Sequence, residues 1–280
     1  MAHRRIGGRD ILMLARELKI SPDTVELDYI QNWILFGLSQ TNASDTLVFK
    51  GGTCLKKVYF KDYRFSKDLD FTLVRDISQN VLKKLLNESL TVATDACGIE
   101  FYIDKICASS QTIFVKIKWS SIHSRRERKL EMNITVFGKE FLTGKYAKKA
   151  IIHEPYNYIE QDYAAKILCY SLEEILAEKI RTLFERKGES GAWPRDLYDV
   201  WKLTQMNYSK DVTLEILKEK IRFKEINIDP ERLERRRDIL KNAWRTSLEK
   251  LVPHGKLPEF DYIFSEVLDI VANLRRILND

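Results

Sequence analysis

The segment 49-FKGGTCLKKVYFKDYRFSKDLDF-71 determines how the rest of the chain is interpreted. It holds a glycine pair, a threonine and an Asp-x-Asp sequence within one short stretch. The apolar residues 47–49 predict the end of a buried strand, Gly51 and Gly52 predict a tight turn, and residues 53–60 predict a short helix.

Residues 68–73 alternate between polar and apolar side chains, which predicts a strand with one polar face. Asp68 and Asp70 then point the same way, roughly 6–7 Å apart along the chain. Two ionised carboxylates this close repel each other unless a cation lies between them. Mg²⁺ prefers a few carboxylate oxygens together with water and substrate phosphates, so the pair predicts a Mg²⁺ site, with Mn²⁺ as the alternative ion.

The glycines precede a predicted helix N-terminus, where they offer backbone N–H groups to a phosphate without a side chain in the way. Taken alone, a glycine pair is often only a turn, and one Asp-x-Asp is often a solvated strand face. Both in this order, in one strand–turn–helix–strand segment, favour a nucleoside triphosphate site. Phosphoryl and nucleotidyl transfer need mainly positioning and charge neutralisation, which these residue types supply.

Four motifs resemble the AbiEii/AbiGii toxin family of nucleotidyltransferases. The segments 50-KGGT-53 and 64-RFSKDLDF-71 are similar to its KGGT turn and its RFS-x-DLDF motif. The segments 177-AEKIR-181 and 194-PRDLYD-199 are similar to its Glu-Lys helix and its Arg-Asp-Leu-Tyr-Asp segment. The likeness extends over roughly 160 residues, from about 45 to 205.

The resemblance implies a polymerase-β-like nucleotidyltransferase fold and Mg²⁺-dependent transfer of a nucleotide from an NTP. It also implies the toxin role in a bacterial type IV toxin–antitoxin or phage-defence pair, with an antitoxin as partner. Some members resemble enzymes that modify the acceptor end of tRNA, so RNA is the expected acceptor. The expected residues are Asp68, Asp70, Lys179 and Asp196 for catalysis, Lys50, Gly51, Gly52, Thr53, Arg64 and Ser66 for nucleotide binding, and Asp68, Asp70 and Glu131 for the metal.

Glu131 is the candidate third metal ligand because it lies on the polar face of a predicted strand over 130–137. Enzymes of the resembled fold often place a third acid on the strand beside the Asp-x-Asp. Two alternatives stay open: Asn133 as a weaker ligand, or Glu131 paired with Arg126 or Lys129. The cluster Arg125, Arg126, Arg128 and Lys129 is predicted with equal weight to contact phosphate or to form a hairpin tip.

Lys179 lies beside the apolar face of a predicted helix that begins at a Ser171–Glu174 capping box and runs to 186. Its ammonium is a candidate phosphate-binding group, and the alternative is a lysine paired with a glutamate. Asp196 and Asp199 share a face of the next helix. Such a carboxylate is expected to hold Lys179 or Arg195, to act as a base on the acceptor, or only to stabilise a helix N-terminus.

The composition describes a globular protein. The 280 residues are 44% hydrophobic and 31% charged, and the net charge of +6 permits a nucleic-acid partner without requiring one. No apolar run reaches the roughly 20 residues of a membrane span, and the N-terminus lacks the apolar core of a signal peptide, so a cytoplasmic protein is expected. The four cysteines have no metal or disulfide spacing and are predicted to be reduced and mostly packed.

The predicted fold is α+β in two parts. Residues 1–165 form a nucleotidyltransferase lobe with a mixed sheet and an N-terminal helical buttress, and 166–280 form a helical lobe that closes one wall of the cleft. The other predicted helices are 9–19, 22–39, 79–96, 210–222, 230–250 and 260–278, with one more from 194. The other predicted strands are 99–103, 112–119 and 166–170, while 138–165 is predicted irregular and 187–191 a flexible link.

Two competing functions remain at this stage. A non-catalytic module would bind nucleotide or RNA on the same scaffold, and a kinase-like enzyme would transfer the γ-phosphate. The two intact acids favour catalysis, because a decayed scaffold has no reason to keep uncompensated carboxylates. No motif identifies the NTP, the acceptor, the antitoxin contact surface or the oligomeric state.

Overall fold

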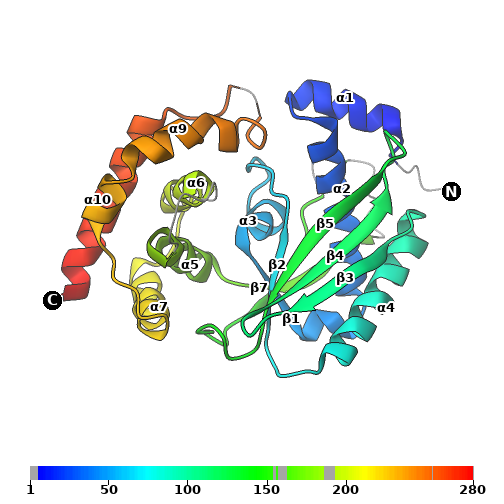
Figure 1. The fold of residues 1–280 in the computed structure, drawn as a ribbon, viewed down its shortest axis with the longest axis horizontal. Helices are drawn as coiled ribbons and strands as arrows, with labels where there is room; N and C mark the ends of the chain where they lie inside the picture. Colours follow the sequence, from blue (N-terminus) through cyan, green and yellow to red (C-terminus); the bar gives the residue numbers. More distant parts are fainter. Residues whose placement is uncertain (1–5, 154–155, 157–162, 186–192, 254, 280) are drawn as a thin grey trace. The chain divides into compact units, whose positions relative to one another are not determined.

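The computed structural model describes residues 6–153, 156, 163–185, 193–253 and 255–279. The chain divides into two compact units. The first holds residues 1–139 and 146–170, and the second holds residues 140–145 and 171–280. The first unit carries the sheet and the second is helical (Figure 1). The architecture is therefore α+β, with a mixed sheet, as predicted.

The first unit is built on a seven-stranded sheet in the order β3-β4-β5-β2-β1-β7-β6. Strand β1 pairs antiparallel with β2 and parallel with β7, and β2 pairs parallel with β5. The remaining neighbours are antiparallel. The strands are β1 (Leu47–Lys50), β2 (Leu69–Leu73), β3 (Tyr102–Ala108), β4 (Thr112–Ser120), β5 (Glu127–Thr135), β6 (Ala147–Ala150) and β7 (Lys166–Cys169).

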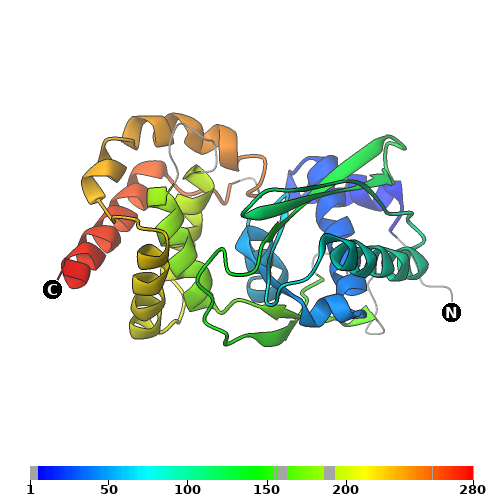
Figure 2. The same cartoon turned by 60° about the horizontal axis from the view of Figure 1, so that its bottom comes forward.

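Helices α2 (Pro22–Ser39) and α4 (Gln79–Cys97) cover one face of this sheet (Figures 1 and 2). Ser21 caps α2, because Thr24 N donates to its side chain at 3.2 Å and Pro22 opens the helix. From the covered face of the sheet, the Trp119 indole donates to Glu26 of α2 at 2.9 Å. The core therefore lies between these helices and the apolar side of the strands. The short helix α1 (Gly8–Leu18) precedes α2.

The glycine segment begins its helix earlier than expected. Helix α3 (Gly51–Cys54) starts at the first glycine, and a π-helical turn (Leu55–Tyr59) continues it. A 3₁₀ turn (Asn42–Asp45) leads into β1.

Two sequence predictions in this unit were wrong. The strand expected at 99–103 is β3, which lies later, at Tyr102–Ala108. The stretch 138–165 was expected to be irregular, but it contains β6. Its sequence, Ala-Lys-Lys-Ala, has low strand propensity, and it forms a strand because it pairs with β7 at the sheet edge, where lysines are common.

The basic cluster at 125–129 lies at a hairpin tip, one of its two predicted positions. Strand β4 ends at Ser120 and β5 begins at Glu127, and Arg125 takes a positive φ of 55° in the turn. The side chain of Arg128 pairs with Asp23 at 2.5 Å. This contact ties the hairpin to the start of α2.

The second unit consists of helices. They are α5 (Leu172–Glu185), α6 (Trp193–Thr204), α7 (Lys210–Phe223), α8 (Pro230–Glu234), α9 (Arg237–Leu248) and α10 (Phe260–Asn279). Within the unit, α5 packs against α6 and α7, and α6 packs against α9 and α10. The single helix predicted over 230–250 was wrong, since the chain breaks between α8 and α9. The predicted link 187–191 lies outside the described residues.

The Ser171 cap of α5 is confirmed, with Glu174 N donating to its hydroxyl at 3.1 Å. The Glu174 side chain does not complete a capping box. It accepts from Thr143 at 2.7 Å and pairs with Lys220 at 3.3 Å, and burial raises the pKa of this carboxyl.

All four cysteines are free thiols, and only Cys107 is exposed. Among the helices described, none combines the length and the apolar character that a bilayer crossing requires.

Candidate active site

The turn after β1 lies directly against one of the two acids. Lys50 pairs with Asp70 in the β1–β2 register, and Gly51 follows with a positive φ of 77°. A Cβ atom on Gly51 would lie 2.5 Å from Oδ2 of Asp70. Only a glycine allows this backbone conformation and this approach together. The glycine turn and the Asp70 carboxylate are therefore in contact.

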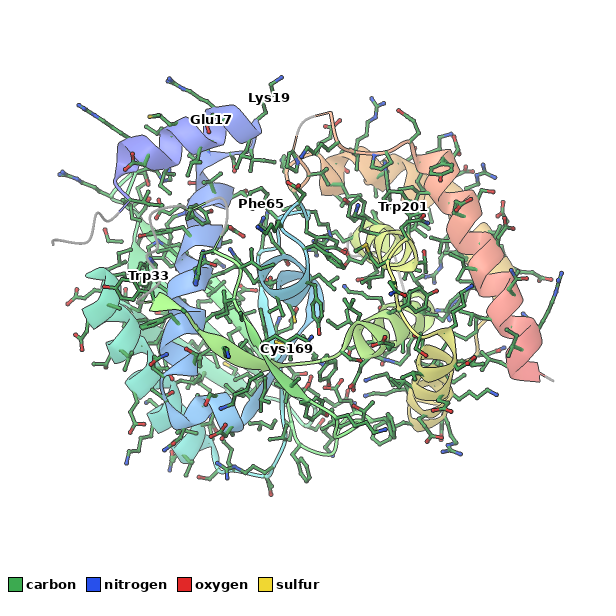
Figure 3. All side chains as sticks on the ribbon, turned by 180° about the vertical axis from the view of Figure 1, so that it is seen from behind. Glu17, Lys19, Trp33, Phe65, Cys169 and Trp201 are labelled. Carbon is green, nitrogen blue, oxygen red and sulfur yellow. The ribbon has the colours of Figure 1, made fainter. Side chains whose placement is uncertain are left out.

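The second glycine lies against the segment that leads to the acids. A Cβ atom on Gly52 would lie 2.7 Å from Nη2 of Arg64 and 3.2 Å from Oγ of Ser66. Arg64 is buried and donates to the Phe65 carbonyl at 3.1 Å. Figure 3 labels Phe65, whose ring lies 4.2 Å from the Lys56 ammonium of the π-helical turn. Arg64 and Ser66 thus pack against the turn and brace it.

Thr53 connects the turn to the start of β2. Its hydroxyl donates to the backbone carbonyl of Asp68 at 2.5 Å, and its side chain is fully buried. Gln31 of α2 donates to the Ser66 carbonyl at 3.1 Å. Both contacts fix the backbone just before the Asp-x-Asp. In this structure Thr53 therefore positions the acids through the Asp68 carbonyl.

Asp68 and Asp70 are both partly exposed. Asp70 lies in β2 and Asp68 just before it, two residues apart on an extended segment, so their side chains share a face. Asn133 of β5 pairs with Asp70 in the parallel register and donates from Nδ2 to Oδ1 of Asp70 at 3.0 Å. The carboxylate in contact with the glycine turn therefore has an amide donor on one side and is partly exposed.

Glu131 lies two residues before Asn133, at the level of Asp68 in the β2–β5 register. Its side chain is 54% exposed and lies 3.5 Å from the Lys129 ammonium. The pairing with Lys129 was one of the predicted alternatives. Within the described ranges, no three His, Cys, Asp or Glu side chains gather as a metal site. On these strands Asp70 and Asn133 are in direct contact, and Asp68 shares their face.

Lys50 faces the same side of the sheet. Its ammonium donates to the Thr135 hydroxyl of β5 at 3.2 Å and lies 5.6 Å from the Tyr170 ring centre. The side chain is 7% exposed. This buried cation one strand away from Asp70 contributes positive charge to a face that also carries the acids.

The second unit contains its own charged cluster. Lys179 of α5 lies 2.7 Å from Oδ1 of Asp196 and 2.9 Å from Oδ2 of Asp199, both on α6. The two carboxylates are 6% and 0% exposed. Lys179 is thus paired with two aspartates. The prediction that an acid of this segment holds Lys179 is confirmed.

Sequence reasoning missed a second buried pair, close to the glycine turn. Lys57 of the π-helical turn lies 2.7 Å from Oδ2 of Asp28 of α2, and both side chains are fully buried. Burial lowers the pKa of Lys57 to about 8, against the opposing effect of Asp28. No sequence signal marked the pair, because almost every residue of α2 is buried and the helix has no polar face.

Known proteins resemble this chain in sequence and in fold. A model of the family described as "Nucleotidyl transferase AbiEii toxin, Type IV TA system" matches residues 33–266. None of the curated proteins is similar enough in sequence to count as a match.

Solved structures show the same fold. MenT4, a nucleotidyltransferase toxin of Mycobacterium tuberculosis H37Rv, aligns with a TM-score of 0.63 at 20% identity, over 96% of this chain and 89% of that chain. JHP933 of Helicobacter pylori aligns with a TM-score of 0.56 at 16% identity, over 93% and 95%. A putative nucleotidyltransferase of H. pylori aligns with a TM-score of 0.56 at 16% identity, over 93% and 98%.

Proposed function

The chain belongs to the AbiEii family of nucleotidyltransferase toxins of type IV toxin–antitoxin systems, and from this premise we propose that it transfers an NMP from an NTP to a hydroxyl group of RNA. The acceptor end of tRNA is the leading acceptor. The enzyme acts in the cytoplasm, where both substrates are found, as the toxin of a toxin–antitoxin or phage-defence pair. A cognate antitoxin protein is the proposed partner.

One observation supports this proposal above the others: the Gly51 backbone lies against the Asp70 carboxylate. Gly51 opens α3, so backbone N–H groups free of side chains are next to an acid that is partly exposed. A triphosphate needs such donors for its outer phosphates, and its α-phosphate needs positive charge beside the carboxylates. The Gly51–Gly52 amides and Thr53 are the proposed contacts for the phosphates, and Lys50, Arg64 and Ser66 support them.

The donor set fits Mg²⁺, and Mn²⁺ as its substitute, because both acids are accessible carboxylates on one face of the chain. Asp68 and Asp70 would hold the ion, with Glu131 as the proposed third ligand after it leaves Lys129. A bound divalent ion would offset negative charge on the phosphate oxygens and lower the pKa of the attacking hydroxyl. In the transfer step the acceptor hydroxyl gives up its proton to solvent as its oxygen bonds to the α-phosphorus, the bond to the β-phosphate breaks, and pyrophosphate leaves.

Lys179 and Asp196 are the proposed catalytic pair of the helical unit. Their short contact fixes the orientation of the ammonium, and Asp199 supports it from the same helix as Asp196. A lysine held in this way is suited to bind a phosphate oxygen.

The test is a transfer assay with purified protein, Mg²⁺, total RNA and each α-labelled NTP in turn. Label in RNA is the expected result, and mass spectrometry of the RNA identifies the acceptor. Asp68→Ala and Asp70→Ala should abolish labelling while circular dichroism stays unchanged, and Asp95→Ala, an exposed acid on α4, should leave it intact. Full activity in either site variant would refute the mechanism.

The same assay separates the two competing functions. A kinase-like enzyme would transfer label only from γ-labelled NTP. A non-catalytic binding module would bind NTP or RNA in a calorimeter but release no pyrophosphate.

A further inference from the structure

The open face of the sheet carries a row of side chains that runs away from the acids. Asn133 donates to Asp70, so these two side chains lie on one face. Phe114 of β4 pairs with Asn133 in the β4–β5 register and therefore lies on that face too. Strands β2, β5 and β4 are adjacent in the sheet (Figure 1). Because neighbouring strands are about 4.8 Å apart, the backbone of Phe114 is roughly 10 Å from that of Asp70.

Phe114 is a large apolar ring that the fold does not use. Its neighbours Ile113 and Val115 point into the core, whereas Phe114 is 50% exposed. A strand position on a polar face ordinarily carries a polar residue. An exposed aromatic ring there offers a flat surface for stacking.

Two lysines lie beside this ring on the same face. Lys105 of β3 pairs directly with Lys116 of β4, two residues along the strand from Phe114. Like charges directly opposite each other across a ladder are destabilising. In the described part of the chain, neither lysine side chain has an ion pair or a hydrogen bond. Glu131 pairs with Lys116 in the register, but its carboxylate lies 3.5 Å from Lys129. An anion between Lys105 and Lys116 would remove the repulsion.

We propose that Phe114, Lys105 and Lys116, here the Phe114 patch, bind the single-stranded 3′ end of the RNA acceptor. The ring stacks on a base near that end, and the two ammonium groups hold a backbone phosphate. Residues two apart on a strand are about 6.6 Å apart, a spacing that a base and its neighbouring phosphate can match. This inference rests on the proposed function and names the residues that hold its acceptor.

The place of the Phe114 patch in the sheet favours the RNA acceptor over the NTP as its ligand. The glycine turn proposed for the triphosphate follows β1, on one side of β2, while the Phe114 patch lies on β3 and β4, on the other side. Asp70 on β2 is between them. An acceptor lying on β4 and β5 would thus approach the acids from the side opposite to the triphosphate, as an attack that expels pyrophosphate requires.

The test measures RNA binding without NTP, so that it is independent of transfer. Fluorescence anisotropy is recorded with a short, fluorescein-labelled single-stranded RNA over a range of salt concentrations. The variants are Phe114→Ala, Phe114→Trp and Lys105→Ala/Lys116→Ala. The matched controls are Phe223→Ala, a ring that is 47% exposed on α7, and Lys83→Ala, an exposed lysine on α4.

Phe114→Ala should weaken binding roughly five- to 150-fold, the range for loss of one stacked base, and Phe114→Trp should restore it. The double lysine variant should reduce the slope of log affinity against log salt by about one per lysine. Both controls should bind like the unmodified protein. In the transfer assay, Phe114→Ala should raise the KM for RNA and leave the KM for NTP unchanged.

Unchanged RNA binding in Phe114→Ala and in the double lysine variant would overturn the inference, and the patch would then be open to a protein partner such as the antitoxin. Absence of RNA binding by the unmodified protein would overturn it as well. If label still passed from NTP to a protein acceptor in that case, the proposed nucleotidyl transfer would stand with a different acceptor.

Discussion

A Cβ atom at Gly51 would lie 2.5 Å from Oδ2 of Asp70, at a residue whose φ is +77°. Gly51→Ala therefore meets two costs: about 1–2 kcal/mol for a left-handed backbone, and a clash that pushes the carboxylate aside. We expect nucleotidyl transfer to fall at least about 100-fold, since a displacement near 1 Å at reacting groups costs that much. Transfer kinetics and thermal unfolding check both effects.

The matched control is Gly138→Ala. Gly138 has a similar φ of +72°, but a Cβ there would meet nothing within 4 Å. Gly138→Ala should lose only the stability that the left-handed backbone costs, and it should keep its activity. Equal loss of activity in the two variants would show that backbone strain, not contact with Asp70, explains the effect.

The hydrogen bond from Asn133 to Asp70 gives a second prediction. Asn133→Ala removes the donor that orients the carboxylate, and groups that orient a metal ligand typically contribute 10–100-fold to metal affinity or activity. We expect the Mg²⁺ concentration for half-maximal activity to rise by a factor in this range. A metal titration of the transfer assay measures it.

The same Mg²⁺ titration distinguishes two roles of Glu131, that of third metal ligand and that of partner to Lys129. If Glu131 is the third ligand, Glu131→Gln shifts the Mg²⁺ requirement as strongly as Asn133→Ala does. Lys129→Ala should then lower the requirement, because Glu131 loses its present partner. No change in either variant would leave only Asp68 and Asp70 as ligands.

The sequence predicts the elements of the site but not the register between them. The order strand, glycine turn, helix and Asp-x-Asp follows from local pattern, and α3 and β2 appear where that pattern lies. The pairing of Asp70 with Asn133 joins residues more than 60 positions apart in the chain. A shift of two residues between β2 and β5 would keep every apolar side chain in the core and still bring Glu131 beside Asp70. Hydrophobic alternation therefore cannot decide between Glu131 and Asn133.

The sequence did not predict which charged residues are buried either. Asp28 lies in a helix whose residues are nearly all buried, so no polar stripe shows where it points. The break between α8 and α9 carries no proline or glycine, and the 230–250 pattern reads as one helix. The edge strand β6 depends on its partner β7 and not on its own residues.

Variants of Lys179 test whether its ion pairs have a structural role only. Lys179→Ala removes the cation that bridges the buried carboxylates of Asp196 and Asp199, and removing one partner of a buried pair costs about 3–5 kcal/mol. Lys179→Arg keeps the charge and should recover most of that stability. Its wider guanidinium does not replace an ammonium at a phosphate, so transfer should stay at least about 10-fold reduced. Denaturant unfolding and kcat measure the two effects separately, and full activity in Lys179→Arg would assign the lysine a structural role.

The buried Lys57–Asp28 pair predicts that the stability of the first unit depends strongly on both partners. Lys57→Met leaves Asp28 as a buried, uncompensated carboxylate and should destabilise the first unit by about 3–5 kcal/mol. Adding Asp28→Leu removes that carboxylate, so the double variant should regain most of the loss. Chemical denaturation of the two single variants and the double variant gives the coupling. Additive losses in the double variant would contradict the prediction.

The burial of His153 predicts that the free energy of unfolding falls in mild acid. Burial lowers its pKa from 6.5 to about 4, with the Lys57 charge as a second cause. Between pH 6.5 and 4 the unfolded chain binds a proton that the folded chain does not, so the free energy of unfolding falls as the pH falls through this window. His153→Gln cannot take up that proton. Its unfolding free energy, measured by urea titration at pH 7 and at pH 4.5, should therefore decline less than that of the unmodified protein, and an equal decline would assign the acid sensitivity to other groups.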